Sequence, residues 1–173
     1  MDNKWTAGKI NGLEVLLENL KKMAVETNKE WADKIGIKQA AAITCVKPSG
    51  TVSQLVDSAS GIHARHNPYY IRTVRGDKKD PLTKMMVDMG FPVEDDVMKP
   101  LDTSVFSFPI KCSKDAVFRQ DMNAIEQLEL WKTYQEHWCE HKPSVTISVK
   151  ETEWIEVGAW VYKNFDLMSG VSF

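Results

Sequence analysis

A glycine flanked by hydroxyl-bearing residues is the stretch of this sequence best suited to bind an anion. The string KPSGTVS follows an apolar run, Ala40 to Val46, whose length and composition predict a buried strand. Pro48 and Gly50 then predict a tight turn. The residues from Thr51 to Val56 predict a short helix with Ser49 as its N-cap. This turn and helix start comprise Pro48, Ser49, Gly50, Thr51, Val52 and Ser53, and the hydroxyls of Ser49, Thr51 and Ser53 could donate to an anion.

The chemistry of this stretch follows from its expected geometry. The first N–H groups of a helix have no internal partners, and the helix dipole adds partial positive charge there. Gly50 lets the backbone approach a ligand closely, and the neighbouring hydroxyls add donors. A capped strand–helix junction without a ligand has the same composition, and no Lys-Ser/Thr pair follows the glycine as in a Walker loop. The residue types alone therefore leave both interpretations open.

A locally basic stretch lies downstream of this turn. Residues 62–79 hold five lysines and arginines against one aspartate. Within it, Tyr69 to Arg75 has the β-branched and aromatic content of a strand. Two interpretations stay open: the arginines are solvated, or one of them or His63 lies beside an anion bound at residues 49–53.

Two further groups of side chains could bind a metal ion. His137 and His141 stand four residues apart in a helix predicted over 123–141, a spacing that can bind zinc. However, Cys139 would lie on nearly the opposite side, and no HExxH pattern is present, so we expect the histidines to favour the helix C-terminus through its dipole. The acidic residues 94–96 lie in a predicted loop without ligand spacing, and we expect them to be solvated.

The other predicted elements alternate between helices and strands, which favours an α/β domain. A capping box at Asn11 and Glu14 predicts a helix that ends at Gly36, and Asp80-Pro81 predicts one that ends at Gly90. The methionine-rich face of the second helix is expected to be core. A third helix is predicted over 151–165 with Ile155, Ala159 and Tyr162 on one face, and strands over 104–110, 144–149 and 167–173.

Length and composition set broad limits. A chain of 173 residues predicts one domain, and the net charge of −2 predicts neither a nucleic-acid nor a membrane partner. The first residues have no apolar core typical of a signal peptide, so we expect a cytoplasmic protein. Three cysteines without a secretory signal predict reduced thiols.

Several strings resemble the adenosylcobalamin-dependent, or class II, ribonucleotide reductases, and most closely their monomeric triphosphate-reductase branch. They are ITCVKPSGTVS, SASGIHARHNPYYIRTVR, DPLTKMMVDMGFPVEDD, PSVTISVK and FDLMSGVSF, which cover most of the chain from Ala40 onward. The resemblance implies a partial α/β barrel of the ribonucleotide reductase type, with residues 1–173 forming one partial domain from the C-terminal portion of the catalytic barrel. It also implies that Pro48 to Ser53 form the loop that holds the substrate's phosphates.

The same resemblance implies a reaction that this chain does not complete by itself. Such reductases convert ribonucleoside triphosphates to deoxyribonucleotides by thiyl radical chemistry, with adenosylcobalamin as initiator and a thiol system as reductant. The family's Asn-x-Cys-x-Glu loop and C-terminal Cys-x-x-Cys pair do not occur here, and Cys45, Cys112 and Cys139 match neither motif. We therefore assign no catalytic residue, expect no activity from the chain alone, and expect the missing N-terminal part of the reductase as its partner.

The alternative is a stand-alone phosphate-binding or interaction module without catalytic activity. A barrel fragment must leave apolar surface uncovered where a neighbour is missing, whereas a finished module should not. Exposed apolar faces are thus the feature that separates the two hypotheses.

Overall fold

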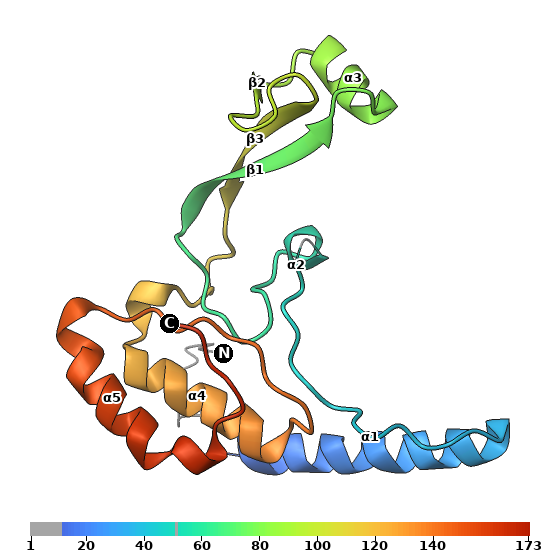
Figure 1. The fold of residues 1–173 in the computed structure, drawn as a ribbon, viewed down its shortest axis with the longest axis vertical. Helices are drawn as coiled ribbons and strands as arrows, with labels where there is room; N and C mark the ends of the chain where they lie inside the picture. The colour runs from blue at the N-terminus through green and yellow to red at the C-terminus, as the bar shows by residue number, and fades with distance from the viewer. Residues whose placement is uncertain (1–11, 51) are drawn as a thin grey trace. The chain divides into compact units, whose positions relative to one another are not determined.

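The computed structural model describes residues 12–50 and 52–173, drawn in Figure 1. They fall into two compact units, one of residues 12–65 with Asp115–Phe173 and one of His66–Lys114. The expectation of one partial domain over residues 1–173 stays a prediction. The first unit contains α1 (Leu13–Ile35), α2 (Val52–Leu55), η1 (Arg119–Asp121), α4 (Ala124–His137), η2 (Glu151–Glu153), α5 (Trp154–Lys163) and η3 (Phe165–Leu167). The second contains β1 (Tyr69–Asp77), α3 (Pro81–Asp88), β2 (Val93–Asp95) and β3 (Thr103–Lys111).

The second unit is a three-stranded antiparallel sheet in the order β1-β3-β2. The strands predicted over 69–75 and 104–110 are confirmed, but the segment that contains β2 was wrongly predicted as a loop. The segment is a strand because its backbone pairs with β3. Just after it, the buried carboxylate of Asp96 accepts hydrogen bonds from Arg75 Nε at 2.6 Å and from the N–H of Met98 at 2.9 Å. The pKa of Asp96 is lowered, first by the Arg75 hydrogen bond and then by that backbone bond. The acidic residues 94–96 are therefore not all solvated.

Helix α3 begins where predicted, but the face that it buries is not the predicted one. Its N-cap Asp80 accepts a hydrogen bond from the Leu82 N–H at 2.8 Å, with proline in the first turn. The methionine-rich face was wrongly predicted as core, since Met85 is 50% and Met89 66% exposed. Thr83 is buried instead, and it fits because Gly76 of β1 has no side chain: a Cβ there would lie 2.4 Å from Thr83 Oγ1.

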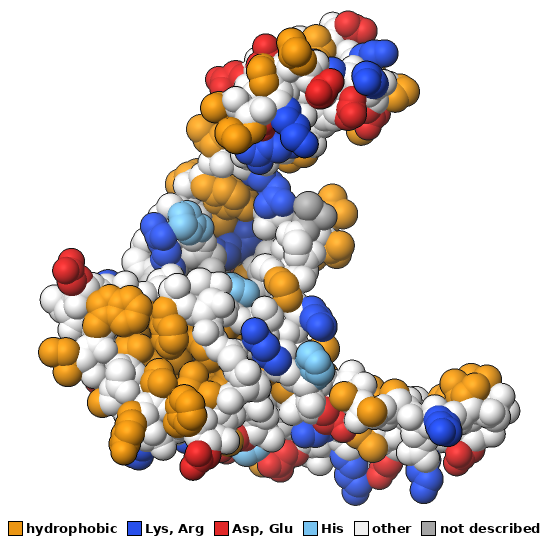
Figure 2. All heavy atoms as spheres, viewed as in Figure 1, with side chains coloured by type: hydrophobic (Ala, Val, Ile, Leu, Met, Phe, Trp, Pro, Cys, Tyr) orange, Lys and Arg blue, Asp and Glu red, His pale blue; other side chains and the backbone are white. Residues whose placement is uncertain are grey.

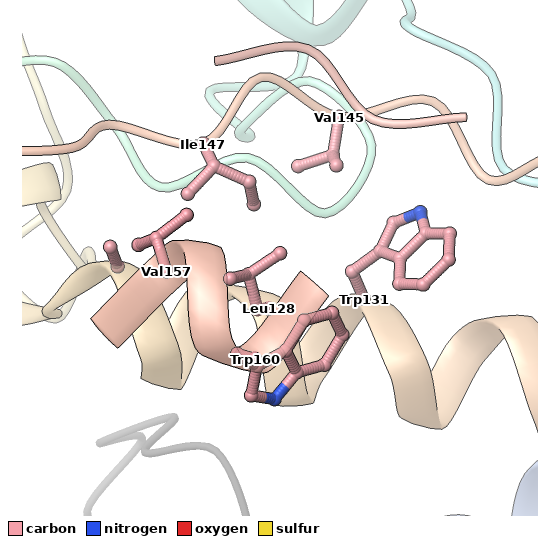
Figure 3. Packing of buried hydrophobic residues seen from close by; sticks show 7 residues of the cluster. Leu128, Trp131, Val145, Ile147, Val157 and Trp160 are labelled. Atoms are coloured by element: carbon pink, nitrogen blue, oxygen red, sulfur yellow. The ribbon is translucent and has the colours of Figure 1, made fainter. Parts of the chain in front are cut away.

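The core of the first unit lies between α4, α5 and two extended segments. Asn123 caps α4 in a capping box with Glu126, as the polar residue before the apolar stripe suggests. Trp131 is fully buried, packs edge-to-face on Trp160, and donates its Nε1–H to the Pro143 carbonyl at 3.1 Å. Figure 3 shows these two indoles with the aliphatic residues of the same cluster, Leu128, Val145, Ile147 and Val157.

The segments predicted as barrel strands are extended but do not form continuous ladders. Residues 40–46 contain no strand in the described part of the chain, and 144–149 and 167–173 share a single parallel bridge between Thr146 and Ser172. The N–H groups of Glu140 and Ser144 donate to the carbonyls of Thr44 and Val46, both at 2.9 Å, so the end of 40–46 lies beside residues 140–144. The strand predictions over these three segments were wrong, because a strand needs a hydrogen-bonded neighbour along its length. The predicted burial of 40–46 was also wrong for residues 40–42, which are exposed, and only Thr44 of this run is buried. With α5 linking two parallel segments, the fold is a partial α/β fold.

The segment after α1 is held in place by one carboxylate. Glu140 Oε2 accepts hydrogen bonds from the N–H of Ile43 at 2.9 Å and of Thr44 at 3.2 Å. Thr44 is buried, its hydroxyl also donates to the Trp138 carbonyl at 2.5 Å, and the Trp138 indole donates to the Cys45 carbonyl at 3.1 Å. The backbone hydrogen bonds from Ile43 and then Thr44 lower the pKa of Glu140. This carboxylate therefore replaces part of a missing strand ladder.

Two helices keep apolar faces uncovered. Helix α1 ends at Gly36 as predicted, with φ of 77°, while Asn11 of the predicted capping box lies outside the described residues. Helix α1 buries Leu17 and Ala32 but exposes a second apolar row, and α5 buries Val157 and Trp160 but exposes the face on its other side. The exposed residues are Leu16, Leu20, Met23 and Trp31 on α1, and Trp154, Ile155 and Tyr162 on α5. Figure 2 shows orange hydrophobic side chains gathered over the region of α5.

We predict that Glu140→Gln lowers the melting temperature of the chain at pH 7 by a few degrees. The pKa of Glu140 is lowered on folding, so its contribution is present above the unfolded-state pKa and is lost as the pH falls through the folded-state pKa. The difference in melting temperature between the parent and Glu140→Gln should therefore shrink in acid. The measurement is thermal unfolding from pH 7 to pH 3, with Glu136→Gln, an exposed glutamate one turn earlier, as the matched control. Equal melting of parent and Glu140→Gln at pH 7 would contradict the prediction.

Candidate functional site

The glycine-containing loop after residue 46 folds back on itself within the first unit. Its backbone has left-handed φ values at Gly50, Asp57 and Gly61 of 58°, 49° and 58°. At Gly61 a Cβ would lie 3.1 Å from Val46 Cγ1, so glycine is needed for both conformation and space. At Gly50 nothing lies within 4 Å of such a Cβ, which leaves open space on the outer side of the turn.

The helix of this loop is shorter than predicted. Helix α2 covers Val52–Leu55, and the predicted site residue Thr51 lies outside the described residues. Its start is closed by the Val52 N–H donating to the Ser49 carbonyl at 3.2 Å, whereas the Ser49 hydroxyl has no partner, so the predicted Ser49 cap is wrong. Because α2 has one turn, its dipole is small and the binding chemistry must come from side chains and single amides.

Two hydroxyls of the loop are buried without a hydrogen-bond partner. Ser49 Oγ and Ser53 Oγ are the only such side-chain atoms within residues 12–50 and 52–173, and Ser53 is 3% exposed. A buried polar group without a partner costs about 1–3 kcal/mol, and native structures hold few of them. Both atoms come from the stretch predicted to hold an anion. Pro48, Gly50 and Val52 of the same stretch are exposed.

A buried cation closes the C-terminal side of the loop. Arg65 is 8% exposed, and its Nη2 lies 2.8 Å from Oδ1 of Asp57. The backbone of Arg65 is fixed by an N–H bond to the Val117 carbonyl at 2.8 Å and by accepting the Arg119 N–H at 2.8 Å. The Arg65–Asp57 pair was not predicted, because the two residues stand eight positions apart in an irregular loop.

The loop is also linked to the core through a histidine. The Ser49 N–H donates to Ser60 Oγ at 2.9 Å, and the Ser60 carbonyl lies 2.6 Å from His63 Nδ1. On its other side, His63 Nε2 accepts the Thr146 N–H at 3.1 Å. His63 was one of the residues expected near the loop, and the structure brings it there. Ser60 was missed, because a serine in a polar loop carries no distinguishing sequence signal.

The other candidate residues are engaged elsewhere. Arg75 contacts Asp96 within the second unit, and His137 Nδ1 lies 2.8 Å from Glu18 Oε1. Helix α4 ends at His137, so His141 does not share a helix face with it. Within the described ranges there is no group of three or more His, Cys, Asp or Glu side chains able to hold a metal ion.

Cys139 is unsuited to nucleophilic chemistry. Cys112 and Cys139 are buried, and no disulfide joins any of the three cysteines. Burial raises the pKa of Cys139 to about 11, with a smaller contribution from Cys45, so the thiol is protonated at neutral pH. A third hypothesis, a complete small enzyme that uses Cys139 with His137 or His141, is therefore not supported. No helix in the described part of the chain is long and apolar enough to cross a bilayer.

Comparison with known proteins identifies relatives over most of the chain. It is 32% identical over 146 residues to the adenosylcobalamin-dependent ribonucleoside-triphosphate reductase of Euglena gracilis, a match covering 83% of this chain and 20% of that protein. It is 28% identical over 141 residues to the enzyme of the same name from Lactobacillus gasseri, covering 79% of this chain and 19% of that protein. No family model matches the sequence. The chain spans about a fifth of the length of these relatives.

A solved structure of a ribonucleotide reductase has a similar fold. The crystal structure of a B12-dependent, class II ribonucleotide reductase matches with a TM-score of 0.75 and 24% identity, over 92% of this chain and 23% of that one. Over the matched residues, this chain is a homologue of one segment of the adenosylcobalamin-dependent ribonucleoside-triphosphate reductases and has the fold of the corresponding part of a class II ribonucleotide reductase.

Proposed function

We propose that this chain supplies the substrate phosphate-binding loop of a ribonucleotide reductase, with Pro48 to Ser53 contacting the phosphates of a ribonucleoside triphosphate. The observation that carries the proposal is the pair of buried hydroxyls, Ser49 Oγ and Ser53 Oγ, that have no protein partner. A phosphate oxygen would accept a hydrogen bond from each. Charge-assisted bonds of this kind contribute about 1.5–3 kcal/mol each, enough to offset the cost of leaving the hydroxyls unpaired in the empty loop.

The surroundings of the hydroxyls support an anionic ligand. The open space beside Gly50 leaves room for a group to approach the turn. Arg65 adds a buried positive charge to the same loop, although it is shared with Asp57. Because both oxygens are shielded from solvent, a ligand has to displace part of the loop as it binds, and α2 with its single turn is an element that can move at little cost.

The whole enzyme's activity is part of the same proposal. Assembled with the remaining four fifths of a reductase, the chain would take part in converting ribonucleoside triphosphates to deoxyribonucleotides by thiyl radical chemistry, with a thiol system as reductant and in the cytoplasm. Adenosylcobalamin, which the relatives' names specify, supplies the radical initiation when bound. The described residues offer no cradle that marks its position, so none is assigned to it, and we place it with the rest of the enzyme.

The uncovered apolar faces favour a reductase segment over a stand-alone module. A helix that is apolar on opposite sides belongs in the interior of a larger structure. Helix α5 has this character, since Val157 and Trp160 are buried on one side while Ile155 is 90% and Tyr162 87% exposed on the other. The face predicted from Ile155, Ala159 and Tyr162 is therefore present but is not the one packed on this unit's core.

We predict that Ser53→Ala weakens binding of the triphosphate without destabilising the chain. Removing a buried hydroxyl without a partner should leave the melting temperature of the chain unchanged or slightly higher. In a reductase assembled from this chain and the rest of the enzyme, the same change should raise the apparent Michaelis constant for the triphosphate severalfold. Thermal unfolding and steady-state kinetics measure the two effects.

Ser58→Ala is the matched control for Ser53→Ala. Its hydroxyl is exposed and contacts only the neighbouring Ala59 carbonyl at 3.3 Å, so neither quantity should change. If Ser53→Ala destabilises the chain and leaves the Michaelis constant unaltered, Ser53 has a structural role and the assignment of the loop as the phosphate site is wrong.

We also predict that the isolated chain binds a hydrophobic dye or self-associates. The motive is the exposed apolar residues of α1 and α5, which form surfaces that monomeric proteins rarely leave uncovered. Dye fluorescence and light scattering measure the two effects. Exchanging exposed Ile155 and Tyr162 for Ser should weaken both, whereas a monomer without dye binding would favour the stand-alone module.

The isolated chain should reduce no ribonucleotide when supplied with adenosylcobalamin and a dithiol. The reason is that its three thiols are matched to none of the family's radical or shuttle positions and that Cys139 is held protonated. Product analysis after incubation is the measurement. Turnover that disappears in Cys139→Ser would overturn the assignment of these cysteines as structural.

A further inference from the structure

We infer that His63 is a positioning residue, whose neutral imidazole forms a strut between the phosphate loop and the extended segment 144–149. The strut consists of three hydrogen bonds in series: Ser49 N–H to Ser60 Oγ at 2.9 Å, His63 Nδ1 to the Ser60 carbonyl at 2.6 Å, and Thr146 N–H to His63 Nε2 at 3.1 Å. The inference rests on the proposed function, since it concerns how that loop is held.

The two contacts of the imidazole specify its tautomer. A carbonyl oxygen only accepts, so Nδ1 must carry the proton that it shares with Ser60. A backbone N–H only donates, so Nε2 must be unprotonated to accept from Thr146. Both conditions are met only by the neutral ring with its proton on Nδ1. The imidazolium and the other tautomer each break at least one of the bonds.

The contact with Thr146 connects the strut to the core of the first unit. Residues 145 and 147, on either side, are buried in the core cluster, so the backbone of this segment is fixed. Thr146 forms the parallel bridge with Ser172, and its N–H is the group that His63 accepts. The imidazole thus accepts the N–H that a neighbouring strand would otherwise accept. Because it also binds the Ser60 carbonyl, it ties the irregular loop to a segment that is packed on the core.

The strut also decides which loop groups a ligand meets. Because the Ser49 N–H is bonded to Ser60 Oγ, this amide is not available to an anion in the present conformation. The unpaired Ser49 and Ser53 hydroxyls remain. Holding the Ser60 carbonyl in place therefore orients Ser49 so that its hydroxyl, rather than its amide, is the group left for the phosphate.

The test uses the whole 173-residue chain, labelled with ¹⁵N, in the parent and in three variants. His63→Ala removes both contacts, and His63→Asn keeps a donor at the Nδ1 position but cannot reach Thr146. His141→Ala, which removes an exposed histidine of the same unit, is the control. Three quantities are measured: the ring nitrogen shifts of His63, amide hydrogen exchange at Ser49, and the affinity for inorganic triphosphate from the shifts of loop amides.

We expect ring shifts of the Nδ1–H tautomer in the parent. In His63→Ala and His63→Asn alike, Ser49 exchange should rise about tenfold or more and triphosphate affinity should fall severalfold, while His141→Ala behaves as the parent. Unaltered Ser49 exchange, an Nε2–H ring, or a His63→Asn variant that matches the parent would each overturn the strut. Faster Ser49 exchange in both variants with no triphosphate binding by the parent would support the strut and overturn the phosphate site instead.

Discussion

The structure of the first unit depends on burying the two indoles, Trp131 and Trp160, between α4, α5 and the segment from Pro143 to Ile147. Full burial of a tryptophan is favourable only if its N–H finds an acceptor, and Trp131 finds the Pro143 carbonyl. That bond brings the extended segment onto the helix at a fixed position. Glu140 holds the residues before the loop through the Ile43 N–H. His63 binds Thr146, which belongs to the segment from Pro143 to Ile147. The loop's position therefore depends on hydrogen bonds to segments that pack on this core.

Both ends of the loop are held by contacts, whereas two hydroxyls in its middle have no hydrogen-bond partner. Gly61 packs directly on Val46 and Lys47, and the backbone of Arg65 is hydrogen-bonded to Val117 and Arg119. Between these anchors stand the two unpaired hydroxyls and the single turn of α2. A protein that only had to connect two segments would gain by replacing Ser53 with alanine. The presence of a buried, unpaired hydroxyl is thus better explained by a ligand than by folding.

The extended segments show what the partial α/β fold lacks within the described residues. Parallel strands are stable when buried on both faces and bonded on both edges. Here few backbone bonds join 44–46 to 140–144 and 146–147 to Ser172, and the side chains of Glu140 and His63 accept N–H groups that a full ladder would use. Side chains can satisfy single amides, but they cannot cover an apolar face. The outer faces of α1 and α5 therefore remain exposed.

The sequence by itself determined the elements whose signals are local. Helix α4 follows from its apolar period, α3 from Asp80-Pro81, and strands β1 and β3 from their β-branched and aromatic content and alternation, whereas their antiparallel pairing was not predicted. The string around Gly50 also identified the candidate loop and its family before any coordinates. In each case the determining residues lie within a few positions of one another, so the chain's own spacing carries the information.

Only the tertiary structure decided the features that join distant residues. Helix α3 packs through Thr83 because Gly76 has no side chain that would occupy its place. The backbone of Ile43, within the apolar run, is held by Glu140, which is 97 residues away in the sequence. Ser49 was predicted as a helix cap from its position, yet its hydroxyl is unpaired because its backbone is held by Ser60. Hydrogen bonds formed across such separations depend on how the elements meet, and local patterns in the chain do not encode that meeting.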